Sequence, residues 1–169
     1  MKTLGFIGTG GMGSGMAANL IKAGNKLVVN DLRREQCKGL ESQGAVYKES
    51  AKAVAESCEI VLSMLPYNEA VRAVGLGSGG LHEATSGAKL WIDFSSIDKK
   101  TIVGVNAELA KRAGRFSTVR QGELKKPRPP AHCRSGFRAQ RRCSMNISLC
   151  LKRWGIRCST SVNWAMPSW

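Results

Sequence analysis

Six consecutive residues near the start of the chain have the types and spacing needed to bind a phosphate. They read GTGGMG, and the positions expected to contact a ligand are Gly8, Gly10, Gly11, Met12 and Gly13. In a motif of this form the first glycine allows a tight turn, the second lets the backbone approach a pyrophosphate, and the last lets a helix pack closely on a strand. The N–H groups and positive dipole end of that helix then face the phosphates. The motif predicts the phosphate-binding turn of a dinucleotide site.

An acidic residue stands where such a site needs a ribose acceptor. Asp31 follows the apolar stretch KLVVN directly, at the end of the next predicted strand. A carboxylate there can accept hydrogen bonds from both adenosine ribose hydroxyls, which favours NAD over NADP. Arg33 and Arg34 come next and are suited to a 2′-phosphate instead, so NADP is not excluded. The alternative is a glycine turn that binds no nucleotide; strand, motif, helix and acidic residue together favour the nucleotide.

The elements that must position these residues alternate between strands and helices. Short apolar runs are typical of buried parallel strands, and apolar residues at three- and four-residue spacing are typical of helices. Strands are predicted at 3–8, 26–31, 45–50, 59–66 and 89–94, and helices at 11–23, 34–44, 51–58, from 68 onward and at 99–113. Strands that alternate with helices imply βαβ units with right-handed crossovers. The fold class predicted is α/β, with a Rossmann-type, doubly wound parallel sheet.

The stretch FIGTGGMGSGMAANL resembles the signature of the 3-hydroxyisobutyrate dehydrogenase family, the β-hydroxyacid dehydrogenases. Its usual form is G-x-G-x-M-G-x-x-M-A-x-N-L, and the matching residues here are Gly8, Gly10, Met12, Gly13, Met16, Ala17, Asn19 and Leu20. Later landmarks of the family are similar to MLP at Met64–Pro66, GGL at Gly79–Leu81 and IDFSSID at Ile92–Asp98. The resemblance covers about residues 2–114.

The resemblance implies hydride transfer between NAD and the alcohol carbon of a short β-hydroxy acid. 3-Hydroxyisobutyrate is the first candidate, and reductases of tartronate semialdehyde or succinic semialdehyde are the alternatives. It also implies cofactor contacts at Leu65, Pro66 and Ser96, where Ser96 keeps the hydroxyl of the family's Thr.

Two pairs of residues in these motifs have a second interpretation. Ser95 and Ser96 are equally suited to turn chemistry or to capping the helix that starts at Lys99. The side chains of Met12 and Met16 are expected to pack in the core.

The family pattern stops after Gly114. The intact family is homo-oligomeric and has a second, all-helical domain that bears a catalytic Lys; its D-x-P-x-x-G-G loop holds the substrate carboxylate. Neither motif stands in residues 115–169, so we predict no catalytic residue. Lys99, Lys100 and Lys111 are expected to be solvated charges. We therefore predict a dinucleotide-binding domain at 1–114, whose sheet is incomplete and lacks its last strand, and a poorly ordered basic tail at 115–169.

The tail differs sharply from the rest of the chain in charge. From Arg115 to Trp169 there are 12 Lys and Arg residues and a single acidic residue, Glu123. A non-catalytic, basic nucleic-acid-binding protein on a truncated Rossmann fold is therefore an alternative function from a different class. The tail has no recognisable motif and few interleaved aromatic residues, so a nucleic-acid partner is not expected. A metal site is another, yet the spacings lack the close Cys pairs of zinc modules, and no metal is predicted. The candidate ligands of such a metal site would be His132, Cys133, Cys143, Cys150 and Cys158.

A shifted reading frame explains the tail more fully. From Phe116 to Cys133 the codons shifted by one base permit LDGPAGGAEEAAAAGTL, which contains several of the family's missing landmarks at their usual spacing. Five shifted codons allow no choice, and one of them, at His132-Cys133, forces the Leu of the family's G-T-L. We therefore expect a frameshift near Gly114–Phe116, with Arg, Pro and Cys arising from GC-rich codons read out of register.

The sequence also bears on the compartment of the cell. The first predicted strand begins almost at Met1, so no secretory signal is visible, and no apolar run approaches the length of a membrane span. We expect a protein of the cytoplasm or the mitochondrial matrix, with no membrane partner and, in a reducing setting, no disulfides.

Overall fold

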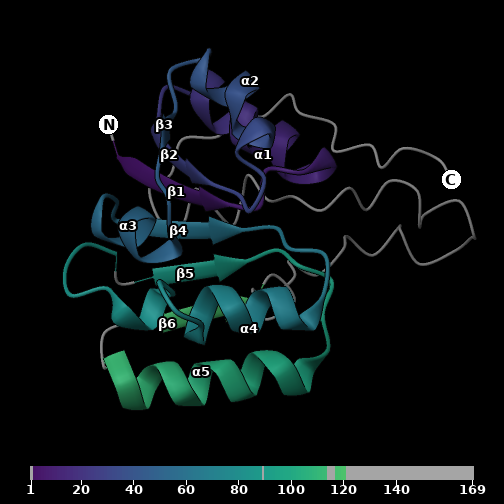
Figure 1. The fold of residues 1–169 in the computed structure, drawn as a ribbon, viewed down its shortest axis with the longest axis vertical. Helices are drawn as coiled ribbons and strands as arrows, with labels where there is room; N and C mark the ends of the chain where they lie inside the picture. Colours follow the sequence, from purple (N-terminus) through teal and green to yellow (C-terminus); the bar gives the residue numbers. More distant parts are fainter. Residues whose placement is uncertain (1, 89, 114–116, 121–169) are drawn as a thin grey trace, which may run out of the picture.

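A six-stranded parallel sheet forms the centre of the fold (Figure 1). The computed structural model describes residues 2–88, 90–113 and 117–120. The strands are β1 (Thr3–Ile7), β2 (Lys26–Asn30), β3 (Val46–Tyr47), β4 (Ile60–Ser63), β5 (Leu90–Asp93) and β6 (Ser117–Arg120). Their order across the sheet is β3-β2-β1-β4-β5-β6, which is that of two mononucleotide-binding halves joined between β1 and β4. The predicted fold class is confirmed.

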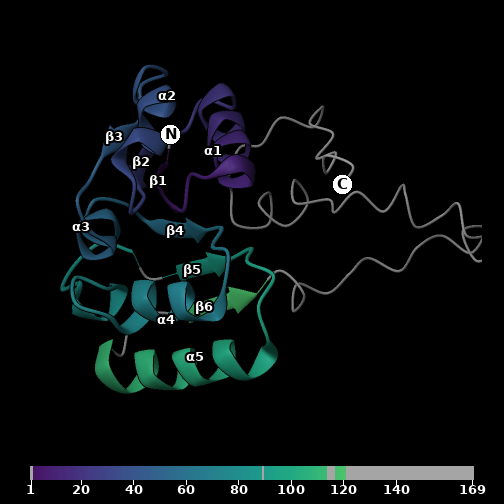
Figure 2. The same cartoon turned by 45° about the vertical axis from the view of Figure 1, so that its right-hand side comes forward.

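Helices cover both faces of the sheet (Figures 1 and 2). They are α1 (Gly11–Lys22), α2 (Lys38–Glu41), α3 (Ala51–Glu56), α4 (Asn68–Leu76) and α5 (Lys99–Ala113), with short 3-10 turns at Arg34–Cys37 and Leu81–Glu83. The single helix predicted over 34–44 is thus a 3-10 turn followed by one short α-helical turn. Gly39 lies inside this segment, and glycine is a poor helix former. Among the described residues, none of the helices has the length and apolar character needed to cross a membrane.

Side chains of the central strands point alternately to two separate cores. In β2, Leu27 and Val29 pack in the core that includes α1 and α2, whereas Val28 packs in the core that includes α3, α4 and α5. Trp91 of β5 is fully buried in the second core and donates from Nε1 to the Ser63 hydroxyl at 2.8 Å. Burial on both faces explains why these strands read as nearly continuous apolar runs.

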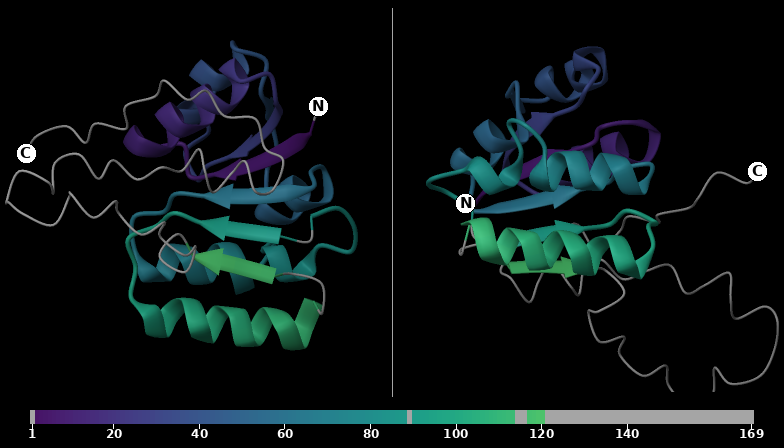
Figure 3. Two further views of the ribbon diagram at one scale, coloured as in Figure 1. Left: turned by 180° about the vertical axis from the view of Figure 1, so that it is seen from behind. Right: turned by 60° about the horizontal axis from the view of Figure 1, so that its bottom comes forward.

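The expectation that the sheet lacks its last strand is wrong. Residues 117–120 form β6, which pairs in parallel with β5 at the end of the sheet (Figure 3). Thr118 and Val119 are β-branched, a residue type that favours strands even in a basic, arginine-rich stretch. The remaining predictions for the tail, which concern the candidate metal ligands and the frameshifted landmarks beyond residue 120, lie outside the described residues.

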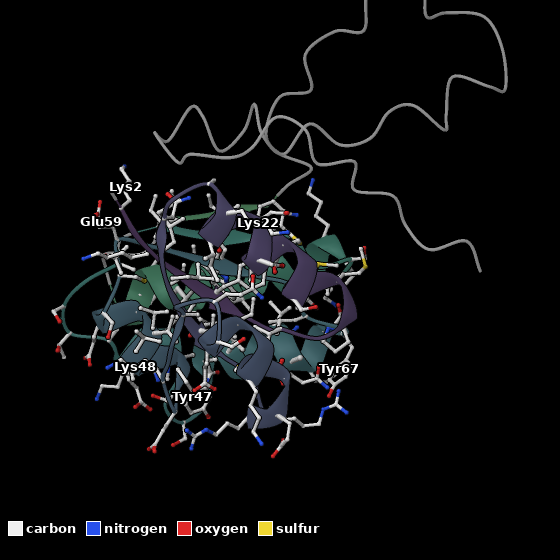
Figure 4. The ribbon with its side chains drawn as sticks, turned by 90° about the horizontal axis from the view of Figure 1, so that it is seen from above. Lys2, Lys22, Tyr47, Lys48, Glu59 and Tyr67 are labelled. Atoms are coloured by element: carbon white, nitrogen blue, oxygen red, sulfur yellow. The ribbon has the colours of Figure 1, made fainter. Side chains whose placement is uncertain are left out.

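All parallel strands end at the same edge of the sheet. Figure 4 shows Lys2 and Glu59, which precede β1 and β4, on one side of the molecule, and Tyr67, which follows β4, on the opposite side. The segments that follow β1, β2, β4 and β5 therefore share one carboxyl edge, where doubly wound sheets bind their ligands.

Candidate dinucleotide-binding site

The turn between β1 and α1 is shaped by two contacts that leave no room for a side chain. Gly8 has a φ of +88°, and a Cβ there would overlap the carbonyl oxygen of Met64. A Cβ on Gly13 would overlap the carbonyl oxygen of Gly8 and lie 3.2 Å from a ring carbon of Phe6. These positions need glycine for the fold itself, in the turning and packing roles that the motif predicted.

Gly10 and Gly11 differ from these two glycines, because nothing in the fold requires them. A Cβ on either would meet no atom of the described residues within 4 Å. The backbone of Gly10 is extended, with φ −62° and ψ −164°, a conformation open to other residues. The space beside this backbone is free for a ligand to occupy, as the motif requires of its second glycine. An uncrowded backbone is one condition for the approach of a pyrophosphate.

The N-terminus of α1 carries no side-chain cap. Its N-cap is Gly10, and its first turn has no acidic residue. Two other helices are capped: Ser50 Oγ accepts from the Ala53 N–H at 3.1 Å in α3, and Asp98 accepts from the Thr101 N–H at 2.6 Å in α5, whereas α2 and α4 also lack a side-chain cap. The first N–H groups of a helix have no intrahelical acceptor. In α1 these donors, together with the positive end of the dipole, are left to an anion.

The carboxylate of Asp31 lies beside this turn and is held by backbone donors. Its Oδ2 accepts from the Thr9 N–H at 2.7 Å, and its Oδ1 accepts from the Arg33 N–H at 3.0 Å. A carboxylate offers about four lone-pair positions, so Asp31 can accept further hydrogen bonds from ribose hydroxyls. The structure thus places the predicted phosphate turn and the predicted ribose acceptor in direct contact.

Thr9 also links Asp31 to a buried cysteine, a role that the sequence did not indicate. The fully buried Thr9 hydroxyl lies 3.4 Å from Asp31 Oδ2 and 3.3 Å from Cys37 Sγ. Burial raises the pKa of the Cys37 thiol, so the thiol is protonated at neutral pH. Position x of the glycine motif accepts many residue types, which is why no signal marked Thr9.

The two arginines after Asp31 have different surroundings. The guanidinium of Arg34 lies over the ring of Tyr47, 5.0 Å from its centroid, a cation–π contact that draws it toward β3. The side chain of Arg33 is exposed, as is that of Leu32, whose exposure of 97% is the largest among the exposed apolar side chains.

The loops after β4 and β5 bring the other predicted contacts to the same edge. Pro66 and Ser96 are exposed there, whereas Leu65 is buried beneath the glycine turn.

The expectation that the side chains of Met12 and Met16 both pack in the core is right for Met16, which is buried, and wrong for Met12, which is 46% exposed.

The interpretation of Ser95 and Ser96 as helix caps is wrong. Asp98 caps α5, accepting from both the N–H and the hydroxyl of Thr101, and these hydrogen bonds hold the pKa of Asp98 below its usual value. Ser95 is buried and bonds to Asp93 and Leu65 instead, while Ser96 is exposed. The capping group is the carboxylate of Asp98, which accepts a hydrogen bond from the N–H three residues later.

The sequence model of one protein family, described as the NAD binding domain of 6-phosphogluconate dehydrogenase, matches residues 3–119. The chain belongs to this family. Within it, the chain has the N-terminal NAD(P)-binding domain of 3-hydroxyisobutyrate dehydrogenase-type proteins, as the resemblance implied.

Three relatives illustrate the similarity. The 3-hydroxyisobutyrate dehydrogenase of Pseudomonas aeruginosa is 42% identical over 114 residues, which are 68% of this chain and 38% of that protein. The glyoxylate/succinic semialdehyde reductase 2 of Arabidopsis thaliana is 32% identical over 125 residues, covering 74% of this chain and 35% of that protein. The Mycobacterium tuberculosis 3-hydroxyisobutyrate dehydrogenase, solved with L-serine, superposes with a TM-score of 0.60 at 28% identity, over 71% of this chain and 39% of that one. The chain thus spans less than two fifths of the length of these relatives.

The open space beside Gly10 leads to a test of the NAD(P)-binding domain. Gly10→Val is expected to abolish NAD binding, measured by calorimetric titration, because its side chain would occupy the pyrophosphate position. The cost to stability should stay near 1 kcal/mol, the effect of a poorer N-cap residue.

The matched control is Gly15→Ala, further along the same helix, where a Cβ also meets no atom within 4 Å. It should bind NAD like the wild type and unfold at a higher temperature, since alanine is the better helix former. Wild-type NAD affinity in Gly10→Val would contradict the site.

Proposed function

We propose that this chain is the cofactor-binding part of an NAD-dependent β-hydroxyacid dehydrogenase with 3-hydroxyisobutyrate as its substrate. The observation that carries the proposal is the contact between Asp31 and Thr9, because it sets a ribose acceptor next to an uncapped helix N-terminus and an open glycine backbone. The similarity to the Pseudomonas aeruginosa enzyme supports this choice of substrate.

Each part of the edge has a distinct task in this proposal. The backbone N–H groups of Gly11 and Met12 bind the pyrophosphate, and Asp31 accepts hydrogen bonds from the hydroxyls of the adenosine ribose. Pro66 and Ser96 border the nicotinamide half, since the second half of a doubly wound sheet takes the second mononucleotide. When bound, NAD supplies the acceptor for the hydride that leaves the alcohol carbon of the substrate.

The preference for NAD over NADP follows from charge. A 2′-phosphate on the ribose would lie against the Asp31 carboxylate, and like charges at short range repel. Of the two arginines that could compensate, Arg34 is already engaged with Tyr47. This arrangement supports NAD as the cofactor.

A second candidate function is the reduction of a small semialdehyde acid, such as succinic or tartronate semialdehyde. The similarity to the Arabidopsis reductase favours it, and the same cofactor site serves both reactions. The two candidates differ in the substrate pocket, for which the described residues offer no carboxylate-binding or proton-transferring motif.

The cofactor preference is tested by Asp31→Ala. Loss of a charged acceptor should weaken NAD binding about tenfold or more, since hydrogen bonds to charged groups are worth roughly 1.5–3 kcal/mol. NADP binding should be unchanged or improve, because the repulsion is removed. Titration of the variant with both cofactors measures the ratio, with Glu35→Ala, an exposed acidic residue nearby, as the control. Equal losses of affinity for NAD and NADP would mean that Asp31 does not distinguish the ribose 2′-hydroxyl of NAD from the 2′-phosphate of NADP.

The dehydrogenase assignment is tested by two proteins, residues 1–169 as they stand and a frame-restored chain extended through the helical domain of the family. We expect NADH formation from 3-hydroxyisobutyrate only with the second protein. General acid–base catalysis raises reaction rates about 10²–10⁴-fold, and the motifs that would supply it are missing from residues 115–169. Comparable turnover by the first protein would refute the proposal that residues 1–169 bind the cofactor while the missing part supplies the catalytic groups. Turnover by the second with succinic semialdehyde alone would favour the second candidate.

A further inference from the structure

A buried polar cluster joins β4 to β5 just below the carboxyl edge. Ser63 and Asp93 are register partners in the two strands, and the Ser63 hydroxyl donates to Asp93 Oδ1 at 2.6 Å. Trp91 in turn donates from Nε1 to the Ser63 oxygen. All three side chains are fully buried, so their hydrogen bonds form in a low-dielectric interior where they are strong and geometrically restrictive.

Ser95 extends this cluster into both neighbouring loops. Its hydroxyl donates to Asp93 Oδ1 at 2.6 Å and accepts from the backbone N–H of Leu65 at 2.8 Å, across 30 positions of sequence. The side chain is buried, and its hydroxyl satisfies one group on each side. It is therefore a buried hydrogen-bonded link between the loop that carries Pro66 and the loop that carries Ser96, in addition to the more exposed hydrogen bond from the Asp98 N–H to Asn68 Oδ1 at 3.2 Å.

The first of these loops also rests against the phosphate turn. The Met64 N–H donates to the Ile7 carbonyl at 3.0 Å, and the Met64 carbonyl lies where a Cβ on Gly8 would be. The turn, the loop after β4 and the loop after β5 are thus connected in series. The adenosine half of a dinucleotide meets the start of this series, and the nicotinamide half meets its end.

The Asp93 carboxylate makes all its hydrogen bonds through one oxygen. Its Oδ1 accepts from both hydroxyls and, at 3.3 Å, from the Ser95 N–H, whereas the buried Oδ2 has no hydrogen-bond partner among the described residues. Among the residues that the structure describes, Ser63 and Ser95 therefore orient this carboxylate. Removing the Ser95 hydroxyl would leave the Leu65 N–H without this acceptor and would remove the buried link between the two loops.

We propose that Ser95, oriented by Asp93, is a positioning residue that holds Pro66 and Ser96 in the arrangement that receives the nicotinamide half of the cofactor. This inference rests on the proposed function and adds to it a residue that acts without touching the ligand. The adenosine half, bound at Gly10 and Asp31, should not depend on it.

The test compares NAD with ADP, which shares the adenosine and the diphosphate but lacks the nicotinamide nucleoside. In calorimetric titrations of the full chain, Ser95→Ala should bind NAD about tenfold more weakly, the effect of one lost hydrogen bond, and should bind ADP like the wild type. Ser95→Thr, which keeps the hydroxyl, should retain the wild-type ratio of the two affinities. Ser50→Ala removes the cap of α3 away from this edge and should leave both affinities unchanged.

Three outcomes would overturn the inference. Unchanged NAD affinity in Ser95→Ala would show that the link is not needed. Equal losses for NAD and ADP would show a general structural role rather than positioning of one half of the site. Equal affinities of the wild-type chain for ADP and NAD would also reject the inference, because the nicotinamide half would then add nothing to binding. A wild-type chain that binds neither ligand would reject the proposed function itself.

Discussion

The close approach of α1 to the end of β1 determines where the rest of this edge lies. The backbone of Gly13 sits against the carbonyl of Gly8, and no side chain fits between them. A larger residue at either position would push the helix away from the strand, because protein interiors cannot absorb even small added volumes without strain. Since α1 begins so close to the strand, its first N–H groups open directly onto the carboxyl edge, where they have no side-chain cap.

Both halves of the candidate site are tied to this turn. On one side, the Thr9 N–H holds the carboxylate of Asp31 in a charge-assisted hydrogen bond. On the other, Met64 packs its carbonyl against Gly8, and the loop that follows is linked through Ser95 to the end of β5. A dinucleotide that lies along the edge would meet groups whose spacing is set by the backbone of one turn. This is how a sheet with short strands and few long loops can preorganise an extended ligand site.

Local pattern was enough to predict most of the sheet and the glycine turn. Buried parallel strands are apolar on both faces, so β1, β2, β4 and β5 stand out in the sequence, and the spacing of Gly8 and Gly13 reflects backbone contacts that any such turn must make. Features that depend on distant partners were not predictable. β6 is a four-residue strand with only two β-branched residues in a basic stretch, and it is recognised through its pairing with β5. The exposure of Met12 and the hydrogen bonds of Ser95 depend on residues brought together by the fold.

The central claim is that the phosphates of a dinucleotide lie on the N-terminus of α1. Backbone amide chemical shifts, followed in nitrogen–proton correlation spectra while NAD is added to the full chain, test it most directly. We predict saturable shifts that are largest for the amides of Gly10, Gly11 and Met12, with smaller changes near Asp31, because these groups would contact the pyrophosphate and the ribose. Saturable shifts that leave these amides unchanged, or no saturable shift at all, would contradict the account.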